Sequence, residues 1–440
     1  MKRFWVFLLA LGMIAVFSGV SSAQVTMKNS GEFYAGGMYL DKTSVRKGVI
    51  DEGSSTAFYF QRLRVRTDFT IAPGLTLTTR FDAMERSWGA QRSNVPLATT
   101  LAADSAGSVA ENENITFDWA YITYSSPIGV FDVGYMNDGS TGTIFGNSYA
   151  PTPRIKYAYV YGPAKIALAY TKVQENSYTR INTAGVADGD NDKYGIQGEY
   201  KWKDVKVGLN VNYYRYASTR QPSNFLRKYF LFTPYVFAKF GPVSMQAEMN
   251  YATGKQEYEL PSLNPDIDLQ GISGWVDATA DFGMVYVGGS VAYVSGDDGG
   301  TLTKNEGFGV NGGRDWNPCL IMWNYERTNW AGNLQGYNGT NQDTAMANGW
   351  FFQARAGVKP IAPLDIMASV SYARAEKPNA VLNRDYGFEV DLTATYKITS
   401  NLSYMLGAGY LFTGDYYKGT NEFNQIDDDF MVINKLTLTF

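Results

Sequence analysis

Residues 58–86 form two runs of alternating apolar and polar side chains around Ala-Pro-Gly at 72–74, and no other stretch constrains the fold as tightly. Period-two alternation is typical of β-strands, and a Pro-Gly break is typical of a tight turn. One side of the first run carries Arg62, Arg64 and Arg66, while Leu63 and Val65 lie on the other. Because burying unpaired charges is costly, the arginine side needs water. The hairpin therefore belongs either to a sandwich sheet with one wet face or to the wall of a water-filled membrane barrel.

The first 23 residues have the pattern of a cleaved leader. Lys2 and Arg3 precede an unbroken apolar run at 4–17, and small residues at 21–23 lead to Gln24. This pattern is typical of a secretory signal peptide, and the apolar run is short for a helix that spans a bilayer. We therefore expect cleavage of residues 1–23 and a single domain formed by residues 24–440.

Composition excludes several classes of function. The chain has 38 Lys and Arg against 42 Asp and Glu, and loss of the two basic residues of the leader leaves 36 against 42, a net charge of −6. This mild acidity gives no support for nucleic-acid binding. The chain has no histidine, which excludes a Ser-His-Asp triad, histidine metal ligands and a histidine general base. Cys319 is the only cysteine, so we expect no internal disulfide and no chemical role for it. We expect no enzyme activity, no cofactor and no metal.

Short breaks and long polar stretches alternate strictly along the mature chain. The short breaks fall at 72–74, 127–129, 162–164, 203–204, 241–242, 282–283, 361–363 and 399–401. The long stretches fall at about 42–56, 87–113, 137–152, 177–191, 218–226, 258–269, 297–347, 377–385 and 414–428. Eight short and nine long connections predict 18 strands, with 16 as the alternative because strand boundaries read from sequence vary by about two to four residues.

A closed barrel explains this pattern better than a sandwich. Eighteen strands in open sheets would leave long edges to protect, whereas closure removes the edges and accounts for the unequal connections. The sequence therefore predicts an all-β fold, a transmembrane antiparallel up-and-down β-barrel with short periplasmic turns and long extracellular loops.

The last eleven residues, 430–440, alternate and end on an aromatic residue. Leu436, Leu438 and Phe440 resemble the C-terminal strand of Gram-negative outer-membrane barrels, in which the final Phe is part of the assembly signal. With the leader and the turn pattern, the mature chain resembles the bacterial general porin superfamily over its full length. This resemblance implies the cell outer membrane of a Gram-negative bacterium, contact with lipid and lipopolysaccharide, insertion by the barrel assembly machinery, and a homotrimer.

The same resemblance implies a passive diffusion channel for small hydrophilic solutes and ions. Two alternatives remain open: a channel selective for an anion or a sugar, and a surface structural protein or adhesin that the barrel anchors. The second alternative would need the long loop at 297–347, because no other segment is large enough to carry it.

Two loops are candidates for narrowing the channel. Porins fold a loop after about the fifth strand into the lumen, and the matching loop here, 137–152, has Thr143, Ile144 and Phe145 at its centre. The loop at 297–347 contains Trp316 and Trp323, and its aromatic residues argue against disorder. It is either a lid or constriction, or a segment packed on the rim or against a neighbouring subunit.

Strand parity also predicts which charged side chains line the lumen. If the turn is 72–74, then Ile71 lies opposite Leu75, Arg66 opposite Arg80 and Arg64 opposite Asp82, which leaves net positive charge on this wall. The predicted basic lining residues are Arg62, Arg64, Arg66, Arg80, Arg154 and Lys156, and the acidic ones are Asp82, Glu248, Asp277, Asp281, Glu389 and Asp391. A basic wall facing an acidic wall would produce a transverse field. The alternative is solvated side chains that pair with one another.

Overall fold

The protein is described here by a computed structural model, which covers residues 25–48, 53–89, 115–138, 142–146, 150–176, 189–218, 225–258, 264–310, 315–378 and 381–440. The predicted leader at residues 1–23 lies outside the described residues.

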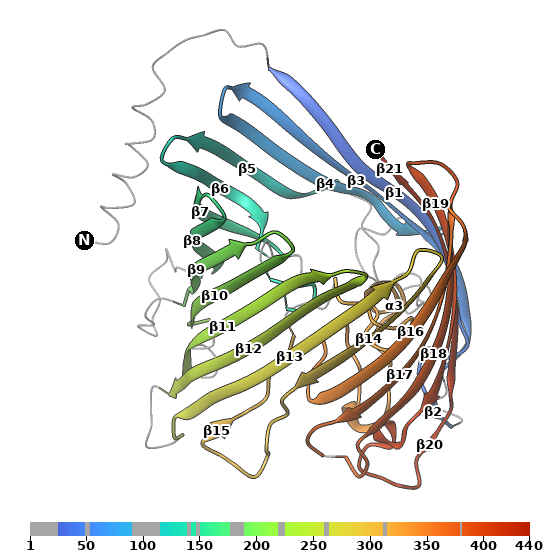
Figure 1. The fold of residues 1–440 in the computed structure, drawn as a ribbon. Coiled ribbons are helices and arrows are strands. Elements are labelled where there is room, and N and C mark those ends of the chain that lie inside the picture. The colour runs from blue at the N-terminus through green and yellow to red at the C-terminus, as the bar shows by residue number, and fades with distance from the viewer. Residues whose placement is uncertain are drawn as a thin grey trace.

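Eighteen long strands form one closed antiparallel barrel (Figure 1). Each strand pairs with its neighbours in the chain, and β1 closes the ring by pairing with both β3 and β21. The predicted count of 18 is confirmed, and the alternative of 16 is wrong. The strands are β1 (Thr26–Leu40), β3 (Thr56–Ala72), β4 (Leu75–Ser87), β5 (Thr116–Ser126), β6 (Gly129–Asn137), β7 (Pro151–Tyr161), β8 (Ala164–Gln174), β9 (Asn191–Lys201), β10 (Val205–Tyr216), β11 (Phe225–Phe240), β12 (Val243–Tyr258), β13 (Ile267–Asp281), β14 (Val285–Val294), β16 (Gly349–Ile361), β17 (Leu364–Ala375), β18 (Asp385–Lys397), β19 (Leu402–Thr413) and β21 (Asp429–Thr439).

Three short strands lie outside this pattern. β15 (Lys304–Asn305) runs parallel to β13. β2 (Arg46–Lys47) and β20 (Gln425–Ile426) form a separate two-stranded sheet that joins the first and last long loops. Beside this sheet, the Lys47 ammonium donates a hydrogen bond of 2.8 Å to Asp427 and holds the pKa of that carboxyl below its usual range. The two loops are thereby tied together at the rim.

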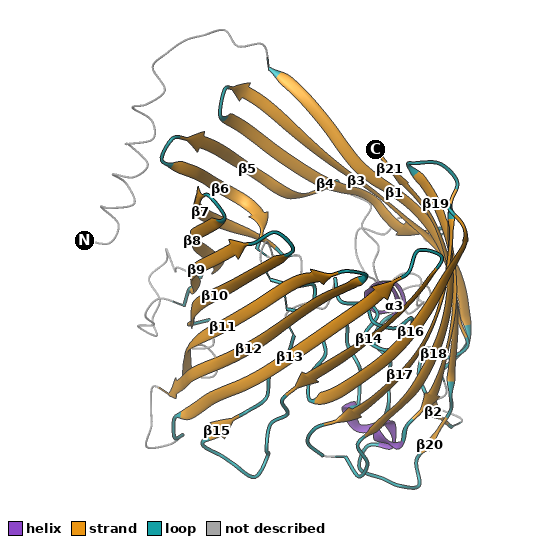
Figure 2. Cartoon of the chain, viewed as in Figure 1, coloured by secondary structure: helices purple, strands orange, loops and turns teal. Residues whose placement is uncertain are grey.

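All eight predicted short turns join consecutive strands, and the nine longer connections join the others. The short turns lie at one end of the barrel, and the described parts of the longer loops lie at the other (Figure 2). In the first hairpin, Arg64 pairs with Asp82 and Arg66 with Arg80, as the sequence predicts. The expected pairing of Ile71 with Leu75 is wrong, because the register shifts there and Leu75 pairs with Ala72.

Apolar and polar side chains point to opposite faces of the wall. On β18, Phe388, Val390 and Leu392 are half exposed on the outer face, whereas Glu389 and Asp391 between them are buried on the inner face. The apolar outer face suits lipid, and the polar inner face suits a water-filled lumen. Among the described residues, no helix is long and apolar enough to cross a membrane.

In the buried apolar cluster, residues of the connection between β14 and β16 pack against strands of the inner wall. Within this connection, α3 (Tyr325–Ala331) is capped by Asn324, whose side chain accepts a hydrogen bond from the backbone N–H of Arg327. Figure 1 places α3 within the barrel. Trp330 of α3 is fully buried and stacks on Phe60 of β3 with 4.6 Å between the ring centroids. The loop is therefore held against the inner wall.

Candidate functional site: a lumen narrowed by two loops

Residues 142–146, which we call the short inner segment, lie against the inner wall formed by β12 and β13. The backbone N–H and the hydroxyl of Thr143 both donate to one carboxylate oxygen of Glu248 on β12, at 2.7 and 3.0 Å. Phe145 is fully buried and stacks on Trp275 of β13 with 5.8 Å between centroids. The segment lies in the connection between β6 and β7, and β12 lies six places beyond β6 in the ring of 18 strands, so the segment reaches a distant part of the inner wall.

A glycine allows this close approach. A Cβ on Gly146 would lie 2.1 Å from a carboxylate oxygen of Glu248, so a side chain at this position would displace the carboxylate. Asn250 holds the other oxygen of Glu248 at 3.0 Å from its amide nitrogen. Glu248 therefore anchors the short inner segment and does not face open water as a free acidic group. Ile144, also predicted to lie in the constriction, is 43 % exposed.

Residues 315–331, which we call the long inner segment, are tied to the opposite half of the wall. Ile321 and Met322 donate their backbone N–H groups to the two carboxylate oxygens of Glu389 at 2.6 and 2.7 Å. On β21, Lys435 donates to Glu326 at 2.8 Å, and Asp429 lies 3.5 Å from Arg327.

The two inner segments touch each other. Trp316 packs edge-on against Phe145 with 5.2 Å between centroids, and it also packs against Phe351 of β16. Trp323 packs edge-on against Phe351 and Tyr386. The described part of the long loop thus contacts both the inner wall and the short inner segment.

The arginine wall of β3 and β4 is fully matched by carboxylates. The contacts are Arg62 to Glu32 at 3.3 Å and to Glu85 at 3.9 Å, Arg64 to Asp82 at 2.6 Å and to Asp118 at 3.7 Å, Arg66 to Asp68 at 3.0 Å, and Arg80 to Asp118 at 2.7 Å. Arg80 also lies over the ring of Trp119, 3.9 Å from its centroid. Five carboxylates therefore face four guanidinium groups, and the expected net positive charge on this wall is absent.

The other two predicted basic residues are also paired. Arg154 is 4 % exposed, lies 3.3 Å from Asp138 and donates to the backbone carbonyls of Asn137 and Asp138 at 3.1 Å. Lys156 lies 3.6 Å from Asp132. Arg154 therefore holds the start of the loop that carries the short inner segment.

On the predicted acidic wall, cations neutralise the two predicted lining aspartates of β13. Arg355 of β16 makes two contacts with Asp277, at 2.7 and 2.9 Å, and Lys359 donates to Asp281 at 2.9 Å. Sequence reasoning missed Arg355, which reaches Asp277 across β14. The one sequence signal for this contact is Gly288 of β14. A Cβ there would lie 2.9 Å from the Arg355 guanidinium, so the absence of a side chain lets Arg355 pass. Interspersed ion pairs thus replace the predicted separation of a basic and an acidic wall.

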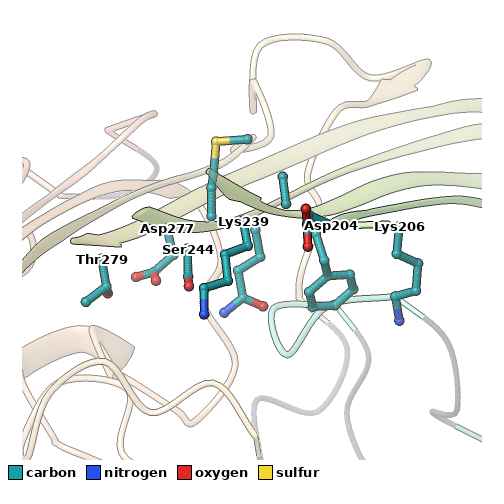
Figure 3. A pocket seen from close by; sticks show the side chains of 10 residues that line it. Asp204, Lys206, Lys239, Ser244, Asp277 and Thr279 are labelled. Carbon is teal, nitrogen blue, oxygen red and sulfur yellow. The ribbon is translucent and has the colours of Figure 1, made fainter. Parts of the chain in front are cut away.

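A recess of about 380 Å³ opens in the wall beside Asp277 (Figure 3). Lys206, Lys239 and Thr279 line it, and their side chains point to the same side of the sheet as Asp277. Lys206 lies over the ring of Phe237, 4.3 Å from its centroid. The recess presents both signs of charge to the lumen.

Phe440, the predicted assembly residue, pairs with β1 beyond the end of β21. Its backbone N–H donates to the carbonyl of Gly31 at 3.0 Å, and the Gly31 N–H donates back at 2.8 Å. Its ring is half exposed on the barrel surface. The C-terminal residue therefore completes the seam where the barrel closes.

A closed barrel with an apolar outside, an ion-paired lumen and inward-folded loops defines a channel of the outer-membrane type. The sequence model of the Gram-negative porins matches residues 10–354, and the chain belongs to this family. It is an outer-membrane diffusion channel. No curated protein matches the chain in sequence.

Solved structures with a similar fold include three proteins of Pseudomonas aeruginosa. OccK11 (OpdR) is 12% identical with a TM-score of 0.53, and the match covers 94% of this chain and 96% of that one. OpdQ is 13% identical with a TM-score of 0.52, covering 94% and 98%. OccK9 (OpdG) is 14% identical with a TM-score of 0.51, covering 94% and 99%. At these identities the likeness concerns the fold alone.

Proposed function

We propose that the lumen passes small hydrophilic solutes and ions by passive diffusion, and that the two inner segments set the size limit. The observation that carries this proposal is the contact between Phe145 and Trp316, which joins segments from different loops inside the barrel. An unobstructed barrel of 18 strands leaves an aqueous channel. The two segments reduce that channel to a narrower passage lined by polar and charged side chains.

The charge arrangement supports weak ion selectivity. Arg62, Arg64 and Arg66 each have a carboxylate within 4 Å, and Asp277 on another strand is held by Arg355. Alternating charges of both signs screen one another, so neither cations nor anions are strongly favoured. The reversal potential in a salt gradient across a planar bilayer tests this, and we expect a value close to zero. A reversal potential close to that of a channel permeable only to cations, or only to anions, would refute weak selectivity.

A substrate-selective channel is the second candidate, and the narrow passage favours it. To test it, small sugars, amino acids and organic anions are added in turn while the ionic current is recorded. A selective channel should be blocked at low concentration by one of these classes alone. The adhesin alternative has less support, because residues 315–331 of the loop it requires contact the inner wall through Glu389 and Lys435.

We also propose that the protein is not an enzyme, since the chain has no histidine and its lumen carboxylates serve ion pairs and loop anchors. The proposed assembly is a homotrimer, inserted by the barrel assembly machinery through a signal that includes Phe440 and surrounded by lipid and lipopolysaccharide. The mature chain is proposed to be one domain of residues 24–440. Intact-mass measurement of the purified protein tests the cleavage after Ala23, and native mass spectrometry in detergent tests the trimer. A mass of the full chain, or a monomer alone, would contradict these proposals.

A further inference from the structure

Three potential metal ligands meet where the long inner segment contacts β18. Cys319 of the segment and Glu389 and Asp391 of the strand each offer one ligand atom, and these atoms lie within 4.8 Å of one another. All three side chains are buried, with exposures of 4 %, 0 % and 3 %. Glu389 and Asp391 are two residues apart on one strand, so both point into the barrel.

Within the described parts of the chain, no Lys or Arg lies within ion-pair distance of Glu389 or Asp391, unlike the paired carboxylates of β4 and β13. One carboxylate oxygen of Asp391 is buried and makes no hydrogen bond. Two adjacent carboxylates in a dry site must gain either a proton or a cation, because burying uncompensated charge is costly.

Small side chains border this cluster. Gly409 of β19 lies beside it, and a Cβ there would sit 2.7 Å from the unpaired oxygen of Asp391 and 3.5 Å from an oxygen of Glu389. Ser369 and Ser371 on β17 are also buried beside the cluster, and the Ser369 hydroxyl lies 3.4 Å from the other oxygen of Asp391. Leu320 lies on the same side, 3.1 Å from that Cβ, and the buried Leu411 pairs with Glu389, so both polar and apolar groups border the cluster.

The donor set indicates the class of ion. Thiolate sulfur prefers soft or borderline metals, whereas Ca²⁺ and Mg²⁺ prefer sites made of oxygen alone. Zinc accepts Cys and carboxylate together, with bonds of about 2.3 and 2.0–2.2 Å that place its ligands roughly 3.5 Å apart. Three protein ligands with a fourth position left for water is a common zinc arrangement.

We propose that Cys319, Glu389 and Asp391 form a binding site for one Zn²⁺-like divalent ion, which fastens the long inner segment to β18. The ion replaces the missing positive charge and links the loop to the wall by bonds stronger than the two backbone hydrogen bonds that Glu389 accepts. The proposal departs from our sequence-based expectation that the chain has no metal and that Cys319 has no chemical role. The proposal does not depend on which solute the channel passes.

The single cysteine makes the site directly observable. The full-length chain is refolded into detergent with Cd²⁺ as the probe, excess metal is removed, and ultraviolet absorption from the Cd²⁺–thiolate bond is recorded together with the bound metal. Because Cys319 is the only cysteine, any such absorption comes from this site. We expect about one Cd²⁺ per chain, displaced by Zn²⁺ but not by Ca²⁺ or Mg²⁺.

Two variants and a control separate this site from non-specific binding. Cys319→Ser should remove the absorption, and Asp391→Asn should weaken binding by at least about tenfold, as loss of a metal-site partner does. The double variant Asp427→Asn with Asp428→Asn removes an acidic pair at the rim and should bind as the wild type does. Absence of the absorption from folded wild type would overturn the proposal and leave two carboxylates that share a proton. Unchanged binding in Asp391→Asn would also overturn it.

Discussion

Replacing Phe145 with alanine should widen the channel without unfolding the barrel. Phe145 is fully buried between Trp275 and Trp316. Truncation of a buried Phe to Ala costs about 3–5 kcal/mol. Since each 1.4 kcal/mol is a factor of ten, the ratio of docked to released short inner segment should fall by about 100-fold or more. The hydrogen bonds from Thr143 to Glu248 remain and oppose complete release.

The assay is single-channel conductance in planar bilayers, where Phe145→Ala should show a larger open level and more flicker between levels. The backbone ladders of the 18 strands do not involve Phe145, so far-ultraviolet circular dichroism should be unchanged. Ile144→Ala is the matched control. Ile144 lies next to Phe145 in the same segment, but its side chain is 43 % exposed, so its truncation should change the conductance little. If the folded Phe145→Ala variant conducts as the wild type and Ile144→Ala do, the short inner segment does not limit the passage.

Two further predictions concern charge and orientation. Changing Arg62, Arg64 and Arg66 together to glutamine leaves their partner carboxylates uncompensated, so the reversal potential in a salt gradient should shift toward cation preference. An unchanged potential with normal conductance would show that this wall does not influence permeating ions. In a Cys319→Ser background, Asn421→Cys in a long loop should react with an impermeant maleimide on intact cells, while Asn401→Cys in a short turn should not. The reverse labelling pattern would invert the predicted topology.

The strand framework could be predicted because its signals are local. The alternation of apolar and polar residues fixes each strand, and the Pro73-Gly74 turn fixes the register that pairs Arg64 with Asp82. The bulge that pairs Leu75 with Ala72 was missed, because a shift of one residue at the end of a hairpin leaves no mark in the alternation.

The electrostatics could not be predicted from the alternation alone. Asp118 reaches Arg80 because the register between β4 and β5 shifts beside Arg80. Arg355 reaches Asp277 from two strands away, over the glycine at 288. Such ion pairs depend on register shifts and on strands that are not adjacent. Strand parity shows which charged residues face the lumen, but it does not show which opposite charge each of them contacts.

The sequence indicated which loops contact the inner wall but not the contacts that they make there. The sequence indicated both loops, and Thr143, Phe145, Trp316 and Trp323 all lie in the inner contacts. Glu248 was assigned to an open acidic wall, whereas it anchors the short inner segment. Contacts between a loop and a strand six places round the ring have no periodic signal in the sequence.

The most direct test of a water-filled barrel narrowed by two inner segments is the conductance of the purified full-length chain with neutral polymers of graded size in the bath. Discrete conductance steps should appear, polymers small enough to enter should reduce the current, and the size at which they cease to do so should be smaller than for an unobstructed barrel of 18 strands. Folded protein that inserts into the bilayer without any steps would contradict the account, as would a size limit equal to that of the open barrel.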